Sequence, residues 1–175
     1  MRNSIEIKGM TCRYPTFALE DIDLTVPCGT VMGLIGENGA GKSTLIKAVL
    51  GLLRPEKGTI TGLGEDSTKL PPTAKSSIGV VFDELPFPKE LNAKQLNKVL
   101  GGIFPNWQDE KFRGYLSSFG LPDNKKLGSF SRGMQMRLSL AAALSHEPSL
   151  PVLDEPTCCL NSCRTKRTRS SFRRT

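Results

Sequence analysis

A glycine-rich segment near residue 40 carries the residue pattern best suited to chemistry. Residues 36–44 read Gly-Glu-Asn-Gly-Ala-Gly-Lys-Ser-Thr and match the spacing G-x-x-x-x-G-K-[ST]. Glycines at this spacing let backbone N–H groups turn inward and form a nest for an anion. Lys42 can then reach the β- and γ-phosphates of a nucleotide, and the Ser43 hydroxyl can bind Mg²⁺. The candidate binding residues are Gly36, Glu37, Asn38, Gly39, Ala40, Gly41, Lys42, Ser43 and Thr44.

Two elements must hold this loop in place, a strand before it and a helix after it. Residues 30–35 are a compact apolar run, which is typical of a buried strand. Residues 42–52 predict a helix that ends near Gly51 and Pro55. The positive N-terminal end of that helix adds to the attraction for a phosphate at the loop. A glycine-rich connection that matches by chance is the competing interpretation, and the agreement of motif and flanking elements argues against it.

The rest of the chain alternates between strand-like and helix-like patterns. Short alternating or apolar runs predict strands in the first half and again near residue 150. From Asn92 the period becomes helical, and Gly101-Gly102, Pro105 and Pro122 separate the predicted helices. We expect strands at residues 4–8, 19–26, 58–61, 77–82 and 150–153, and helices at 92–100, 108–119 and 131–145.

The phosphate loop indicates a nucleotide and Mg²⁺, but it does not separate ATPases, GTPases and kinases. The longer run at residues 33–45 resembles the ATP-binding subunit of ABC transporters, and further motifs follow in family order over about residues 3–157. This resemblance implies an α/β fold of the P-loop NTPase class, ABC ATPase type. It implies a mixed, largely parallel core sheet in residues 1–157, with a helical subdomain at about 92–145.

An aromatic residue precedes the phosphate loop where the family stacks a ring on adenine. Tyr14 occupies this place in the run Tyr-Pro-Thr-Phe-Ala-Leu at residues 14–19. A purine can stack on an aromatic ring without specific hydrogen bonds to the base, so a tyrosine side chain is sufficient. Phe17 is the alternative stacking residue, and a tyrosine packed on the core at a strand end is the structural alternative.

Residues 131–135 resemble the family signature, usually Leu-Ser-Gly-Gly-Gln. Phe130 stands for the leucine, Arg132 for the first glycine and Met134 for the glutamine, while Ser131 and Gly133 are kept. A serine hydroxyl and bare N–H groups at a helix start can hold a phosphate. In the family they contact ATP held by the opposite subunit. This Phe-Ser-x-Gly-Met form resembles bacterial exporters of drugs or peptide antibiotics.

The segment at residues 150–157 resembles the second nucleotide motif of the family. The resemblance makes Asp154 a Mg²⁺ ligand through water and makes Glu155 the general base, or the residue that orients the attacking water. Asp83 stands where the family has a glutamine and is the third metal-site candidate beside Ser43, with Glu84 competing for that place. The alternative to a catalytic role is structural: Asp154 and Glu155 are then two carboxylates that cap a surface turn.

Residues 158–175 depart from the family pattern. Six of the 24 basic residues and none of the 17 acidic residues lie in 162–175, so the net charge of +7 belongs mostly to this tail. We expect residues 158–175 to be a basic, disordered tail. The loss of family-like sequence after Thr157 predicts a C-terminally truncated domain and a shifted reading frame. His146, the one histidine in the sequence, is expected to be an ordinary residue at a helix end.

The resemblance implies an ATP-binding, ATP-hydrolysing subunit that drives export through a separate transmembrane permease. It implies ATP and Mg²⁺ as ligands, a second ATP-binding subunit as homo- or heterodimer partner, and a place on the cytoplasmic face of the cell membrane. No nucleic-acid partner is expected, because residues 1–161 are nearly neutral. The alternatives are a soluble, non-transport ABC-type ATPase and a truncated nucleotide-binding remnant without turnover.

Overall fold

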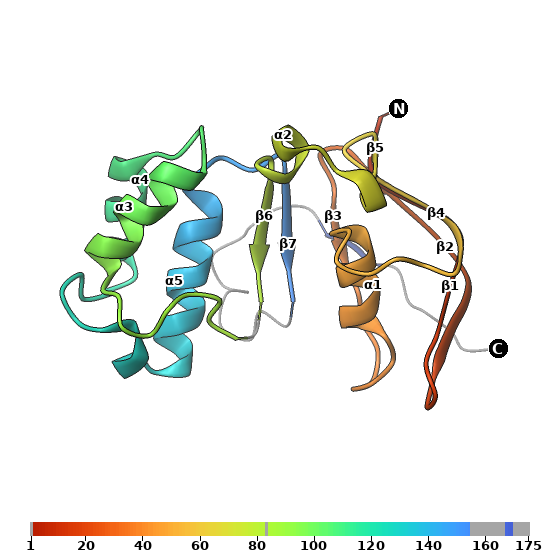
Figure 1. The fold of residues 1–175 in the computed structure, drawn as a ribbon, viewed down its shortest axis with the longest axis horizontal. Coiled ribbons are helices and arrows are strands. Elements are labelled where there is room, and N and C mark those ends of the chain that lie inside the picture. Colours follow the sequence, from red (N-terminus) through yellow and green to blue (C-terminus); the bar gives the residue numbers. More distant parts are fainter. Residues whose placement is uncertain (1, 83, 155–166, 170–175) are drawn as a thin grey trace. The chain divides into compact units, whose positions relative to one another are not determined.

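The computed structural model describes residues 2–82, 84–154 and 167–169 (Figure 1). The chain divides into two compact units, and each is described by itself. Unit 1 comprises residues 1–74 and 164–175, and unit 2 comprises residues 75–163. Strands β6 (Ile78–Val81) and β7 (Leu150–Leu153) therefore belong to the same unit as the helices that follow residue 92, and the phosphate loop belongs to the other unit.

Unit 1 is built on an antiparallel sheet with the strand order β2-β1-β4-β5. Short turns join β1 to β2 and β4 to β5, as antiparallel pairing allows, while β1 and β4 are distant in the chain and pair antiparallel as well. Strand pairing among the described residues is thus mixed, as expected, but the largest sheet is antiparallel rather than parallel. Parallel pairing joins β3, the strand before the phosphate loop, to β8 (Arg167–Arg169), and β6 to β7. The strands are β1 (Asn3–Arg13), β2 (Ala18–Pro27), β3 (Val31–Gly33), β4 (Lys57–Gly62) and β5 (Glu65–Asp66).

Helix α1 (Lys42–Val49) packs its apolar side on this sheet. Leu45 and Val49 of the helix belong to one buried cluster with Ile7 and Met10 of β1 and Ile60 of β4. Burial of these side chains stabilises the unit and fixes the start of α1, where the phosphate loop ends. A 3₁₀ turn (Ser67–Lys69) and the short helix α2 (Pro72–Lys75) follow β5.

Strand β3 pairs in parallel with strand β8 (Arg167–Arg169), which belongs to the basic tail. The composition of residues 158–175 predicts no strand, so β8 departs from the expected disorder at these three residues. Backbone hydrogen bonds to a neighbouring strand do not depend on side-chain type, and this explains how a basic segment can pair. The remaining residues of the expected tail lie outside the described part of the chain.

Unit 2 combines the parallel pair β6 (Ile78–Val81) and β7 (Leu150–Leu153) with three helices. The helices are α3 (Ala93–Ile103), α4 (Asp109–Ser118) and α5 (Arg132–Leu144), with a 3₁₀ turn at Leu127–Ser129. Their core buries Leu96 of α3, Phe112 of α4, Leu127 of the turn and Leu138 of α5, each 1% exposed or less. This core holds the start of α5 in place.

Helix α3 runs further than the sequence predicts. Asn92 begins it with a capping box, in which the Asn92 side chain accepts from the Gln95 N–H and the Gln95 side chain accepts from the Asn92 N–H. The expected stop at Gly101-Gly102 is wrong, because the helix continues to Ile103. A Cβ on Gly101 would lie 3.3 Å from the Trp107 ring, so this glycine makes room for tertiary packing instead of ending the helix.

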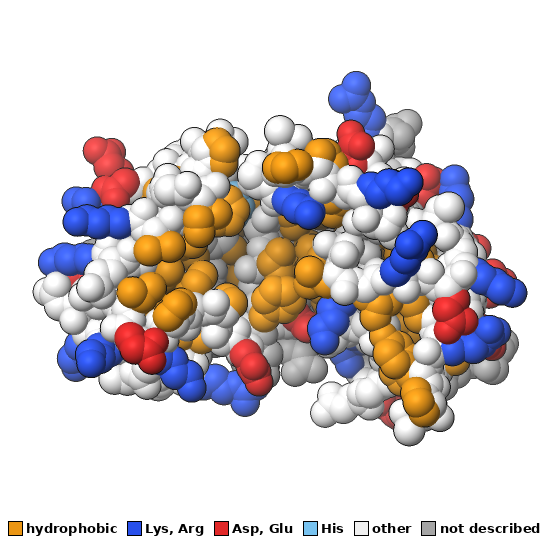
Figure 2. Space-filling model, in the orientation of Figure 1, with side chains coloured by type: hydrophobic (Ala, Val, Ile, Leu, Met, Phe, Trp, Pro, Cys, Tyr) orange, Lys and Arg blue, Asp and Glu red, His pale blue; other side chains and the backbone are white. Residues whose placement is uncertain are grey.

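Apolar side chains reach the surface over the helices of unit 2 (Figure 2). Val99 and Ile103 of α3 are the large hydrophobic residues of this helix that are exposed, at 46% and 63%. Among the described residues no helix is both long and apolar enough to cross a bilayer.

Candidate functional site

The phosphate loop is an open turn between β3 and α1. Gly39 and Gly41 adopt positive φ angles of 81° and 90°, which turn the backbone in a direction that side chains disfavour. A Cβ on Gly39 would meet no atom within 4 Å, so the loop leaves open space beside the backbone. The predicted strand before the loop is shorter than expected and ends at Gly33.

The side chain of Lys42 folds back over the loop. Its Nζ donates to the carbonyl oxygens of Gly36 and Glu37, both at 2.9 Å. The ammonium group is therefore held above the same backbone whose N–H groups would face an anion. Lys42 is also the first residue of α1, where the helix dipole is positive. A loop with open space, a helix start and a fixed cation fits the phosphates of a nucleotide.

Two aromatic side chains lie at the tip of the β1–β2 hairpin, close to this loop. The rings of Tyr14 and Phe17 stack with centroids 4.9 Å apart and planes 8° from parallel. Leu19, two residues further on, lies against Gly41, because a Cβ placed on Gly41 would be 2.7 Å from Leu19 Cδ2. The structure thus brings the predicted stacking residue and the predicted phosphate loop to one region of unit 1. Tyr14 is 39% exposed, so it is not packed in the core.

The signature residues Ser131 and Gly133 lie at the start of α5 in unit 2. Ser131 caps the helix, and its Oγ accepts from the Met134 N–H at 3.3 Å. Gly133 has no atom within 4 Å of the place a Cβ would take. Phe130, which stands for the leucine of the family signature, is buried in the helical core and fixes this end of the helix. The start of α5 thus has a serine-capped N–H and open backbone at Gly133.

Asp154 follows β7 at the carboxyl end of the parallel pair. Its N–H donates to the carbonyl of Val81, the last residue of β6, at 2.9 Å. The pairing fixes the backbone of Asp154 beside the end of β6. A carboxylate at this place suits Mg²⁺, which prefers oxygen ligands. Asp83 and Glu155 lie outside the described residues, while Glu84 is exposed. No cluster of three or more metal-binding side chains occurs within the part of the chain that the structure describes.

Pro151 fits β7 without disturbing its pairing with β6. Leu150 and Asp154 donate to carbonyls of the β6 side, at Ser77 and Val81. Since backbone groups alternate along a strand, the nitrogen of Pro151 points away from β6. The missing N–H therefore costs no hydrogen bond in this pair.

His146 follows α5 and packs inside unit 2, as expected for a residue at a helix end. It is 2% exposed, its ring stacks on Phe104 with centroids 4.2 Å apart, and Nε2 lies 3.4 Å from the carbonyl oxygen of Ile78. Burial lowers the pKa of His146 and outweighs its backbone hydrogen bonds, which raise it. The neutral ring contributes packing.

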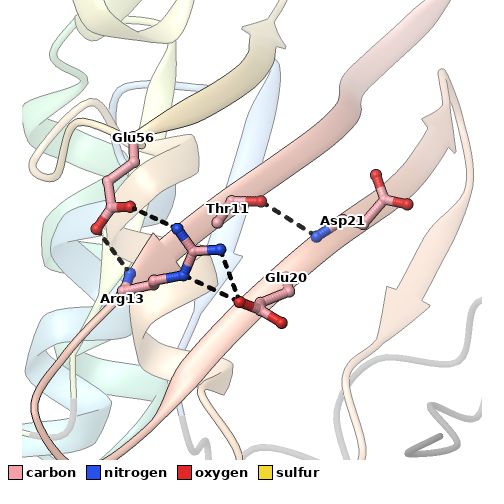
Figure 3. Close-up of polar contacts among 5 residues, drawn as sticks. All are labelled: Thr11, Arg13, Glu20, Asp21 and Glu56. Carbon is pink, nitrogen blue, oxygen red and sulfur yellow. Dashed lines mark hydrogen bonds and ion pairs between the residues drawn. The ribbon is translucent and has the colours of Figure 1, made fainter.

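An ion-pair bridge near Tyr14 was not visible in the sequence. The guanidinium of Arg13 contacts Glu20 of β2 and Glu56, which precedes β4 (Figure 3). Glu20 is seven residues from Arg13 and Glu56 is 43 residues away. No short motif joins them, and only the strand pairing brings them together.

Comparisons with known proteins decide the family. The ABC transporter family matches residues 19–158. The chain belongs to the ABC transporter family. It is 36% identical over 150 residues to the ABC transporter ATP-binding protein NatA of Bacillus subtilis (strain 168), covering 82% of this chain and 61% of NatA. It is also 36% identical over 165 residues to the daunorubicin/doxorubicin resistance ATP-binding protein DrrA of Streptomyces peucetius, covering 90% of this chain and 50% of DrrA.

A solved structure of the ATP-binding subunit of an ABC transporter has the same fold. It superposes with a TM-score of 0.79 at 28% identity, covering 88% of this chain and 67% of that chain. The fold is thus that of an ABC ATPase, as the sequence resemblance predicts. The chain spans about half to three fifths of the length of the two curated relatives named above.

Proposed function

We propose that the chain is the ATP-binding and ATP-hydrolysing subunit of an ABC transporter, and that it couples hydrolysis to export through a separate membrane subunit. The observation that carries this proposal is the phosphate loop, in which Lys42 is held over positive-φ glycines at the start of α1. The exposed Tyr14 ring beside the loop supplies a surface for adenine.

Each side chain has a separate role in this proposal. The N–H groups of residues 36–44 and the Lys42 ammonium hold the phosphates, and Tyr14 stacks on the base. Ser43, Asp83 and Asp154 would hold Mg²⁺, which neutralises charge on the phosphate oxygens when bound. Glu155 accepts the proton of the attacking water or orients it. Oxygen atoms of hydroxyl and carboxylate groups are the donor set that this ion prefers.

A second ATP-binding subunit completes the proposed site. Ser131 and Gly133 offer an oxygen-capped helix start with open backbone, which suits the γ-phosphate of ATP held by a partner. The partner is a second copy of this chain or a related subunit. No nucleic acid takes part, because the body of the chain is nearly neutral.

Export is the proposed direction of transport. The Phe-Ser-x-Gly-Met form of residues 130–134 supports it, and DrrA, a relative of the chain, is named for drug resistance. The subunit would then lie at the inner face of the cell membrane, bound to a transmembrane permease.

The first experiment measures ATP binding and phosphate release by the purified chain. We expect binding and Mg²⁺-dependent turnover, and we expect Lys42→Ala to weaken ATP binding about 10- to 100-fold, as loss of charge-assisted hydrogen bonds implies. Lys47→Ala is the matched control, since Lys47 is an exposed lysine on the same helix. Binding without turnover would support the nucleotide-binding remnant instead, and no binding by the wild type would refute the proposal.

The second experiment tests the membrane partner. The chain is expressed with a membrane protein encoded beside it, and both are reconstituted in vesicles. We expect ATP-dependent movement of substrate out of the compartment that contains the chain. Movement into that compartment would contradict export, and ATPase activity with no bound membrane partner would support a non-transport ABC-type ATPase.

A further inference from the structure

Arg13, at the end of β1, links β2 and the residue before β4 next to the aromatic turn. Its Nε donates to Glu20 Oε1 at 2.9 Å, and its Nη1 donates to Glu56 Oε2 at 3.5 Å (Figure 3). The Arg13 N–H also donates to Glu56 Oε1 at 3.2 Å. Glu56 in turn is fixed to β1, because its N–H donates to the Thr11 carbonyl at 2.9 Å. The last residue of β1 is therefore held through both its backbone and its side chain.

The turn that follows Arg13 consists of residues 14–17. Arg13 and Ala18 are register partners at the ends of β1 and β2, and the Tyr14 N–H donates to the Phe17 carbonyl at 2.8 Å. The turn thus begins at the residue that Glu20 and Glu56 hold. Within it, Phe17 covers one face of Tyr14, since the rings are nearly parallel at 4.9 Å.

The surroundings of Tyr14 are open. Tyr14 lines a hollow of about 190 Å³ together with Arg13, Glu56, Cys12, Leu53 and Arg54. The ring therefore borders accessible space on the surface of unit 1. Leu19, which follows the turn, lies against Gly41 of the phosphate loop.

Folding stability alone does not account for the Arg13 bridge. The side chains of Arg13, Glu20 and Glu56 are 53%, 59% and 47% exposed, and exposed ion pairs add little to stability. Two carboxylates from different segments, Glu20 of β2 and Glu56 before β4, do, however, restrict the rotamers of one guanidinium and the backbone before the turn. A fixed ring binds a flat partner with a smaller loss of conformational entropy than a mobile ring does.

We propose that Arg13 is a positioning residue for nucleotide binding: with Glu20 and Glu56 it fixes the turn in which Phe17 backs Tyr14, and so presents the free face of Tyr14 to a nucleobase. This inference rests on the proposed ATP-binding function. It assigns a role in base recognition to an ion-pair bridge at the end of the β1–β2 hairpin.

The experiment compares two probes by calorimetry, MgATP and inorganic tripolyphosphate with Mg²⁺. We expect Arg13→Gln to weaken ATP binding about threefold to tenfold, a part of the stacking contribution, and to leave tripolyphosphate binding within about twofold. Glu20→Gln should act in the same direction. Lys8→Gln is the matched control, because it breaks the exposed Lys8–Glu6 ion pair on the same strand, away from the turn.

A double variant separates positioning from general loosening of the fold. In a Tyr14→Ala background, Arg13→Gln should weaken ATP binding no further, since the side chain it positions is absent. Equal loss of ATP and tripolyphosphate binding, additive losses in the double variant, or an unchanged ATP affinity would each overturn the inference. Failure of the wild type to bind either probe would refute the proposed function itself, which is a different result.

Discussion

Gly41 is the residue at which the phosphate loop becomes α1, and both its backbone and its surroundings favour glycine. Its φ angle is 90°, and an added Cβ would lie 2.7 Å from Leu19 Cδ2. Gly39 has a similar φ of 81° but open space around it. A side chain at Gly39 would therefore meet backbone strain alone, whereas a side chain at Gly41 would meet both backbone strain and crowding against Leu19.

We expect Gly39→Ala to lower the free energy of unfolding by about 1–2 kcal/mol, the strain of an L-residue at positive φ. Gly41→Ala should lower it by about 1 kcal/mol more, because Leu19 must also shift. Urea unfolding of both variants measures the difference. Equal losses would show that Leu19 yields without cost and that the contact with the hairpin does not fix the loop.

His146 makes the stability of unit 2 depend on pH. Burial lowers its pKa in the folded state, whereas the unfolded chain has a pKa near 6.5. Below about pH 6.5 the unfolded chain therefore binds more protons, and stability falls as pH falls through the folded-state pKa. Above about pH 6.5 the His146 ring is neutral in both the folded and the unfolded state, so it no longer makes stability depend on pH.

The melting temperature should thus decrease from pH 7.5 to pH 5.5 in the wild type. His146→Gln should remove most of this dependence, because the sequence contains no other histidine and carboxylates titrate lower. Thermal unfolding at the two pH values tests this. An equal slope in the variant would assign the dependence to other groups.

At the scale of elements, the parallel pair β6–β7 has a crowded position on β6 and a tolerant position on β7. Gly79 and Pro151 are register partners. Pro151 is exposed and its nitrogen points away from β6, whereas a Cβ on Gly79 would lie 2.7 Å from the Ala143 carbonyl oxygen and from Pro148 Cγ. Gly79 thus lets α5 and the chain after it pack directly on β6.

Gly79→Ala should therefore lower the free energy of unfolding by about 1–3 kcal/mol, the usual effect of overpacking. Pro151→Val should change it by less than about 1 kcal/mol, because no hydrogen bond to β6 is gained or lost. Denaturant unfolding of the two variants compares the two paired strands of one ladder. A large gain for Pro151→Val would show that the proline strains the strand.

The elements that the sequence predicts well are those defined by local pattern. Residues 150–153 form β7 as predicted, and the helix predicted at 131–145 is α5 at Arg132–Leu144. A local apolar run defines β7. Helical periodicity and the Ser131 cap define α5. The failures come from distant contacts: β1 continues past Gly9 through a register shift, and α3 continues past Gly101 because Trp107 packs there.

The same division holds for the candidate site. A strand, a glycine turn and a helix start are local, so residues 30–44 predict the elements that flank the glycine turn, β3 and α1, although both are shorter than predicted. The Arg13 bridge and the contact of Leu19 with Gly41 join residues brought together only by strand pairing. No spacing in the sequence predicts them.

At the scale of the whole molecule, the candidate residues are divided between two compact units. Lys42, the phosphate loop and Tyr14 belong to unit 1, whereas Ser131, Gly133 and Asp154 belong to unit 2. Each unit has its own buried core. In the proposed function, Lys42, the phosphate loop and Tyr14 bind the nucleotide, whereas Glu155 acts on the attacking water.

This division predicts that binding and turnover can be separated by single substitutions. Glu155→Gln should reduce phosphate release at least 100-fold, because a general base contributes about 10²–10⁴ in rate, and ATP should still raise the melting temperature. A ligand at 100 times its Kd adds about 2.7 kcal/mol of stability by mass action. Lys42→Ala should reduce both phosphate release and the ATP-induced rise in melting temperature, because it removes the cation that holds the phosphates. Thermal shift with ATP beside a phosphate-release assay distinguishes the two variants, and loss of ATP-induced stabilisation in Glu155→Gln would show that nucleotide binding depends on that carboxylate as well.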